Sequence, residues 1–368
     1  MHLPNKLPLA LFTLETSSVS SRTRAFTVIL LLMLLSSLGI AQNPGSPPSG
    51  PQDAPQYPPA TDAPNQPGNT VQIPAESKPT VRKDQDTFVI RTEVDEVLLH
   101  ATVVDDRRHL VMDLSRDNFE VFENNSPQRI TSFRHADIPV SIGIVIDNSG
   151  SMRDKRPAVN QACLNLVRAS NPQDQVFIVN FNDEYYLDQD FTSDIAKLKE
   201  GLEKIESRGG TALYDAVVAS AQHLKKNTQL EKRVILVVTD GEDNASRLSL
   251  EQALRRLQEE NGPTVYSIGI LGEERQKRAK RALSAMSEQT GGQAFFPKDL
   301  KEVDDISREV AHDIRNQYII GYKPTTPQAA GGFRTVKVQA HAPHHGKLFV
   351  RTRSGYYANE QRAALQEN

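Results

Sequence analysis

The chain has 368 residues, with 43 lysines and arginines against 46 aspartates and glutamates, and one cysteine. This length exceeds a typical single domain, and the near-balanced charge, without long runs of one sign, argues against nucleic acid as a partner. Because Cys163 is alone, an intrachain disulfide and a cysteine-built zinc site are excluded.

Residues 1–41 have the pattern of a secretory signal peptide. Basic residues, the last of them Arg24, precede the uncharged apolar stretch AFTVILLLMLLSSLGIA, which ends with small residues at Gly39 and Ala41. The stretch is shorter than the roughly 20 residues that span a bilayer comfortably. We therefore expect cleavage after Ala41 and export, either to a periplasm or out of the cell. The alternative is an uncleaved segment that anchors the chain in the membrane.

Residues 42–85 are rich in proline and poor in large apolar side chains, as in NPGSPPSGPQDAPQYPPATDAPNQPG. Such a composition cannot bury enough surface to fold, so we expect a disordered linker. A proline-rich ligand for a recognition domain is the alternative function of this segment.

Two segments with alternating apolar and polar residues flank the middle of the chain. In residues 86–137, EVLLHATVVDD, DNFEVFEN and RITSFRH predict a small antiparallel β unit with turns at DDRRH and ENNSP. In residues 317–358, NQYIIGYKP, FRTVKVQAHAP and GKLFVRTRSGYYA predict further strands, before a tail at 359–368. We expect the two flanks to pair and to form one split β unit around the domain between them.

Residues 138–316 alternate between strand and helix patterns, which predicts an α/β domain with a doubly wound, mainly parallel sheet and helices on both faces, as in Rossmann-like folds. The runs VSIGIVI, RVILVVT and TVYSIGI are almost entirely apolar, so they belong in the centre of the sheet, where both faces are covered. In such sheets the ligand site lies beyond the carboxyl ends of the strands.

Five oxygen-bearing residues are predicted to meet at that edge. Asp147 ends the first strand and is followed by Ser149 and Ser151, Thr211 follows two glycines, and Asp240 ends the strand RVILVVT. Without histidine or thiol, this set suits a hard cation, with Mg²⁺ favoured and Mn²⁺ or Ca²⁺ as alternatives. Because the hydroxyls are uncharged, the bound cation would keep part of its positive charge and would attract a carboxylate from outside the site.

The motifs DNSGS, the isolated Thr211 and TDG resemble the metal-ion-dependent adhesion site of von Willebrand factor type A domains, and they match all five positions. The resemblance implies a protein partner that presents an exposed Asp or Glu to the metal. The wider sequence also resembles the VWFA-related family best represented in Acidobacteria. The similar segments are NFEVFENNSPQRITSF before the domain, TGGQAFFP late within it, and NQYIIGYKP and RTRSGYYA after it.

We therefore expect an exported, metal-dependent protein-binding or adhesion module that is not an enzyme. No G-x-x-x-x-G-K-[ST] motif occurs, so a nucleotide is not expected to bind, and no G-x-S-x-G motif surrounds the serines. One alternative is a magnesium-dependent hydrolase in which Glu242 or Asp243 serves as the general acid or base. A structural envelope protein with a vestigial site is the other.

Overall fold

The computed structural model describes residues 96–203, 207–271, 276–326 and 331–358. These residues all belong to one structural unit, residues 83–368. The predicted signal peptide, the predicted linker and the C-terminal tail lie outside the described residues. Among the helices that are described, none is both long and apolar enough to cross a membrane.

Within the described residues, six strands form the central sheet in the order β10-β9-β8-β5-β6-β7. Neighbouring strands are parallel except for β7, which runs antiparallel to β6 at one edge. Every residue of β5 is buried, as its apolar sequence predicted. The strands are β5 (Val140–Asp147), β6 (Gln175–Phe181), β7 (Tyr185–Thr192), β8 (Lys232–Thr239), β9 (Thr264–Gly269) and β10 (Ala294–Phe295).

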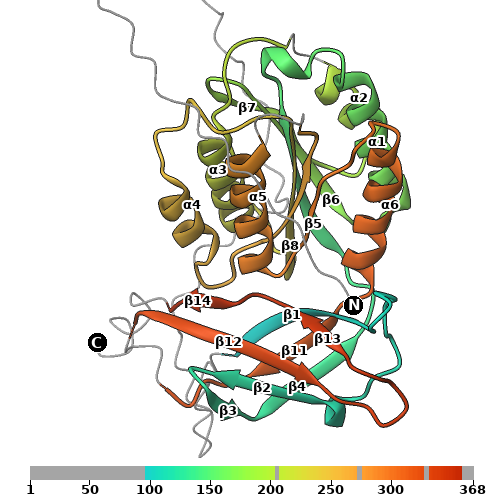
Figure 1. Cartoon of the computed structure of the whole chain (residues 1–368), viewed down its shortest axis with the longest axis vertical. Coiled ribbons are helices and arrows are strands. Elements are labelled where there is room, and N and C mark those ends of the chain that lie inside the picture. The colour runs from blue at the N-terminus through green and yellow to red at the C-terminus, as the bar shows by residue number, and fades with distance from the viewer. Residues whose placement is uncertain (1–95, 204–206, 272–275, 327–330, 359–368) are drawn as a thin grey trace, which may run out of the picture. The chain divides into compact units, whose positions relative to one another are not determined.

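Helices cover both faces of this sheet, and each face has its own apolar core (Figure 1). One face packs against α1 (Arg156–Ala169), α2 (Ile195–Glu203) and α6 (Glu302–Arg315). The other packs against α3 (Leu213–Asn227), α4 (Leu250–Leu257) and α5 (Gln276–Thr290). The predicted doubly wound α/β fold is confirmed. Neither α6 nor the antiparallel strand β7 was predicted from the sequence.

The flanking strands pair with one another as predicted, and the described segments contain two four-stranded sheets, β13-β1-β11-β4 and β14-β12-β2-β3, around a third apolar core. Strand β1 pairs with β11 and β2 pairs with β12, so each sheet contains strands from both flanks. The strands are β1 (Val97–Val104), β2 (Phe119–Glu123), β3 (Ser126–Gln128), β4 (Ile130–His135), β11 (Tyr318–Tyr322), β12 (Phe333–Ala340), β13 (Phe349–Arg351) and β14 (Gly355–Tyr357).

The turn ENNSP connects β2 to β3, and both of its asparagines are left-handed, with φ of 48° at Asn124 and 64° at Asn125. Asparagine tolerates this conformation better than most residues, and two consecutive left-handed residues match the twist of a tight hairpin. The predicted chain reversal at this position is confirmed.

A buried acid joins the two flanks inside the β unit. Glu123 on β2 accepts hydrogen bonds from the Tyr322 hydroxyl at 2.7 Å and the Tyr356 hydroxyl at 2.8 Å. Its other oxygen accepts a hydrogen bond from Arg334 at 3.2 Å, and both side chains of this ion pair are 2% exposed. Burial, together with the neighbouring carboxylate, raises the pKa of both tyrosines, so their hydroxyls remain protonated donors.

A second buried acid connects the β unit to the α/β domain. Asp313 on α6 accepts hydrogen bonds from the Thr102 hydroxyl of β1 at 2.9 Å and from the Tyr266 hydroxyl of β9 at 2.6 Å. It also forms an ion pair with Arg351 of β13. Because these partners come from both parts of the molecule, the network holds the β unit against the α/β domain.

Candidate metal centre

Asp147, the last residue of β5, lies fully buried at the switch point of the sheet, where the chain proceeds to β6 on one side and returns as β8 on the other. Its Oδ1 accepts a hydrogen bond from the Ser149 amide at 2.8 Å, and its Oδ2 accepts one from the Thr239 hydroxyl at 2.6 Å. Burial raises the pKa of the Asp147 carboxyl; these hydrogen bonds oppose the shift, and the nearby Asp240 charge adds to it.

The loop after Asp147 brings two hydroxyls together, and one of them contacts the second acid. The Oγ atoms of Ser149 and Ser151 lie 3.2 Å apart, and Ser151 donates a hydrogen bond to Asp240 Oδ1 at 2.8 Å. The loop leads into the short 3₁₀ helix η2 (Gly150–Met152), for which Ser149 is the N-cap residue. Its side chain makes no capping hydrogen bond there, so helix capping does not account for this serine.

Thr211 lies in a loop that packs closely against Asp183. The two glycines that precede Thr211 make this close approach possible. Gly209 is left-handed, with φ of 75°, and a Cβ atom there would lie 2.1 Å from an oxygen of Asp183. The Thr211 amide donates to Asn244 Oδ1 at 2.9 Å. The Thr211 hydroxyl faces the segment after β8, because a Cβ on Gly241 would lie 3.5 Å from Thr211 Oγ1.

All five residues predicted for the site thus come from segments that converge at the carboxyl edge of the sheet. Of these residues, Asp147, Ser149 and Thr211 are at most 4% exposed, whereas Ser151 is exposed to solvent. The Asp240 side chain is 1% exposed. The buried members are held in position by hydrogen bonds, and the exposed serine marks the side from which solvent reaches the site.

Two residues that were not predicted from the sequence contact the predicted ligands. Lys155 forms an ion pair with Asp240, and the Thr239 hydroxyl binds Asp147. The sequence could have indicated Thr239, because this residue directly precedes Asp240 at the end of a strand that was expected beside β5. No sequence pattern indicates Lys155, since its approach to Asp240 depends on how the chain turns between the 3₁₀ helix and α1.

The donor set fits a hard divalent cation. Ligand oxygens around octahedral Mg²⁺ lie at about 2.1 Å from the metal, so neighbouring ligands are about 3.0 Å apart. The oxygen separations of 3.2 Å between Ser149 and Ser151 and 2.8 Å between Ser151 and Asp240 bracket this value. Two carboxylates and three hydroxyls without a softer ligand match Mg²⁺, Mn²⁺ or Ca²⁺.

Replacing Lys155 with methionine is expected to increase the affinity for Mg²⁺ about fivefold, equivalent to roughly 1 kcal/mol. The ammonium group forms an ion pair with Asp240 and would compete with a cation bound there, whereas methionine keeps the length of the side chain without the charge. Isothermal titration with MgCl₂ checks this, with Lys226→Met, an exposed position on α3, as the matched control. An unchanged or lower affinity of Lys155→Met would contradict the proposed competition.

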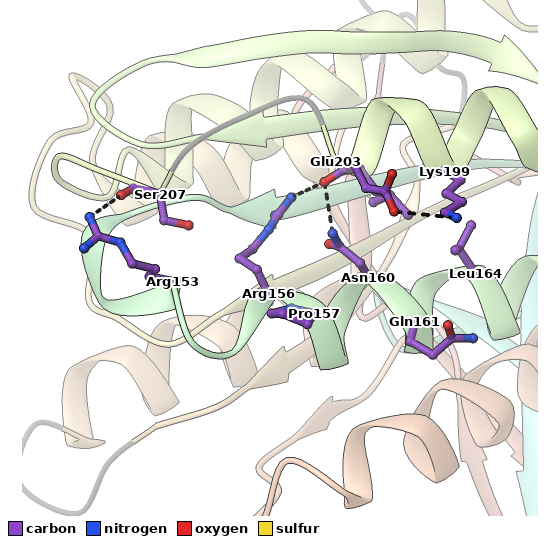
Figure 2. A pocket seen from close by; sticks show the side chains of 10 residues that line it. Arg153, Arg156, Pro157, Asn160, Gln161, Leu164, Lys199, Glu203 and Ser207 are labelled. Atoms are coloured by element: carbon purple, nitrogen blue, oxygen red, sulfur yellow. Dashed lines mark hydrogen bonds and ion pairs between the residues drawn. The ribbon is translucent and has the colours of Figure 1, made fainter.

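A cavity of about 700 Å³ lies between α1 and α2, and Arg153, just after η2, contributes to its lining. Figure 2 shows Arg156 and Asn160 directed toward the end of α2, where both donate to the Leu202 carbonyl, at 2.8 and 3.0 Å. Arg156 also contacts the Asp147 carbonyl at 3.4 Å. This buried arginine therefore braces the strand end that carries Asp147 against α2.

Residues 142–242 match the family of von Willebrand factor type A domains, and the α/β domain of this chain belongs to that family. The chain is 29% identical over 172 residues to the calcium-activated chloride channel regulator 3A-1 of Mus musculus. It is 23% identical over 185 residues to the inter-alpha-trypsin inhibitor heavy chain H4 of Bos taurus. These matches include 44% and 46% of this chain, and the chain spans 18% of the length of each relative.

Among solved structures, the von Willebrand factor type A protein of Catenulispora acidiphila is similar, with a TM-score of 0.44 and 13% identity. The similarity covers 73% of this chain and 74% of that protein.

Proposed function

We propose that this protein binds another protein through a divalent cation held by Asp147, Ser149, Ser151, Thr211 and Asp240. The observation that carries the proposal is the convergence of these five oxygen donors at the switch point of a type A domain. Mg²⁺ is the favoured cation, since it retains waters and accepts few direct carboxylates.

The charge of the site favours a carboxylate as the partner's contact group. Asp147 and Asp240 contribute two negative charges, and Lys155 compensates one of them. When bound, a divalent cation would exceed the remaining negative charge of the site and offer a coordination position to an outside ligand. An exposed Asp or Glu of a partner protein supplies both the charge and the oxygen. The exposed side of the site at Ser151 leaves room for such an approach.

The magnesium-dependent hydrolase is less well supported, because such an enzyme needs a general acid or base besides the ligands. Asp243 is engaged in the local structure: it accepts hydrogen bonds from the Tyr214 amide at 2.9 Å and from the Ser246 hydroxyl at 2.6 Å. These contacts hold the start of α3 and leave that carboxylate little freedom for proton transfer. The intact set of five donors likewise speaks against a vestigial site.

We further propose that the protein acts outside the cytoplasm, either released after cleavage or anchored by the apolar segment that ends near Ala41. A periplasmic or secreted location would bring the type A domain to partners on the envelope or beyond it.

Partner capture from a native envelope fraction is expected to require the cation. With Mg²⁺ present the wild-type protein should retain its partner, whereas EDTA, Asp147→Ala or Thr211→Ala should each abolish retention, since each removes the cation or one of its ligands. Pull-down followed by quantification of the retained protein measures this. Asp305→Asn, which removes an acid whose side chain is 84% exposed on α6, is the matched control and should bind normally.

Equal retention of the partner with and without EDTA would rule out the metal-dependent mechanism. Turnover of a phosphate ester in proportion to bound metal would instead favour the hydrolase.

A further inference from the structure

A second polar cavity lies between the β unit and the α/β domain, away from Asp147. Its volume is about 170 Å³, enough for several water molecules or one small polyatomic ion. The β unit contributes His100 from β1 together with Thr352 and Arg353 from the segment between β13 and β14. The α/β domain contributes Arg233 at the start of β8 and Asn261, which is exposed and places the cavity within reach of solvent.

Three polar atoms of the cavity lining are buried without a hydrogen-bond partner among the described residues: Arg233 Nε, Thr352 Oγ1 and His100 Nδ1. A buried donor without an acceptor costs about 1–3 kcal/mol, and more when the group is charged. Three such atoms around one cavity indicate a bound group that completes their hydrogen bonds.

The positive charge of the cavity lining favours an anion over water as the bound group. Arg233 donates to the Asn261 carbonyl at 3.2 Å and Arg353 donates to the Glu259 carbonyl at 3.1 Å. Within the described residues neither guanidinium forms an ion pair with a carboxylate. The one acid that lines the cavity, Glu231, is paired with Arg134. The Glu260 charge also acts on Arg353. Water would complete the hydrogen bonds but would add no negative charge beside the two guanidiniums.

The pKa of His100 responds to the positive charge around the cavity. Burial, followed by the charges of Lys232, Arg353 and Arg134, lowers the pKa of His100 to about 3. Burial also lowers the pKa of Arg353 to about 10. An anion in the cavity would reduce the part of the His100 shift that these positive charges cause.

We propose that this cavity binds one small tetrahedral oxyanion, phosphate or sulfate, held by Arg233, Arg353 and Thr352. Arginine presents several N–H groups in a planar fork that suits such oxyanions, and the threonine hydroxyl adds a neutral donor. Neutral His100 either donates from Nδ1 or accepts the proton of a hydrogen phosphate, depending on its tautomer. Because the ligands come from both parts of the molecule, the anion strengthens the attachment of the β unit to the α/β domain.

The test uses the full chain in EDTA, so that phosphate cannot bind a cation at Asp147. Broadening of the ³¹P resonance of inorganic phosphate is expected to saturate at one ion per chain. At equal ionic strength, phosphate and sulfate should raise the unfolding temperature more than chloride or acetate. Arg233→Gln and Thr352→Val are each expected to weaken phosphate binding at least about tenfold, as expected for loss of a charge-assisted or buried hydrogen bond. Arg278→Gln, at an exposed position on α5, should leave it unchanged.

Absence of saturable phosphate binding would overturn the proposal, as would equal binding by wild type and Thr352→Val. The threonine variant keeps the shape and the charge of the cavity, so it decides the question if Arg233→Gln fails to fold. Acetate that binds as tightly as phosphate would overturn the assignment to a tetrahedral oxyanion.

Discussion

Asp147→Asn is expected to reduce the affinity for Mg²⁺ at least about a hundredfold, equivalent to roughly 2.7 kcal/mol, while the protein remains folded. Asparagine has the shape of aspartate, can accept from the Ser149 amide and can donate to the Thr239 hydroxyl, so the local hydrogen bonds persist. The charge that faces the cation is lost. Isothermal titration with MgCl₂ measures the affinity, and Asp305→Asn serves as the control that removes an exposed acid.

The same substitution is expected to change how the metal-free protein responds to pH. Burial raises the folded-state pKa of Asp147, so its contribution to stability is fully present below the unfolded pKa of about 4 and is lost as pH rises through the higher folded value. Asparagine does not ionise. In EDTA, Asp147→Asn should therefore become increasingly more stable than wild type as pH rises above about 4. Urea unfolding at a series of pH values measures the difference.

Metal affinity of the wild type should rise over the same pH window, because the cation requires the ionised carboxylate. At ten times its dissociation constant the metal adds only about 1.4 kcal/mol to the free energy of unfolding. The metal-free protein is therefore expected to stay folded. Unfolding of Asp147→Asn at neutral pH, or undiminished binding of Mg²⁺ by it, would contradict the role assigned to Asp147.

Glu123→Gln is expected to lower the free energy of unfolding by about 3–5 kcal/mol. The substitution removes the negative charge of Glu123 from its ion pair with the Arg334 guanidinium, which is 2% exposed, and it weakens the acceptor for the Tyr322 and Tyr356 hydroxyls. Glu123 lies on the N-terminal flank and its three partners lie on the C-terminal flank. The substitution therefore weakens the contacts that join the two flanks of the split β unit.

Urea unfolding measures this loss, and the double variant with Glu123→Gln and Arg334→Met should regain part of it, because the buried charge that Glu123 balanced is then removed as well. Arg308→Gln, which removes an exposed arginine from a surface ion pair on α6, is the control and should change stability by less than about 1 kcal/mol. If Glu123→Gln is no more destabilising than this control, the buried ion pair does not stabilise the β unit.

The amino-acid sequence by itself determined the type of most major elements and the identity of the five candidate ligands. Local periodicity is sufficient for this purpose: the apolar run of β5 requires cover on both faces, and the alternation in β12 requires one buried face. A parallel sheet brings the ends of neighbouring strands to one edge, so Asp147 and Asp240 were expected together before any contact was known. Helix α6 was missed although Val303, Val310 and Ile314 lie on its buried face.

Only the tertiary structure decided which distant groups meet. The ion pair of Lys155 with Asp240 spans 85 residues of sequence, and the contact of Glu123 with Arg334 spans 211. The antiparallel direction of β7 and the cavity around Arg233 and Thr352 depend in the same way on the packing of separate elements. Sequence patterns report which face of an element is buried, whereas the identity of a buried partner depends on strand register and helix placement, which only long-range packing specifies.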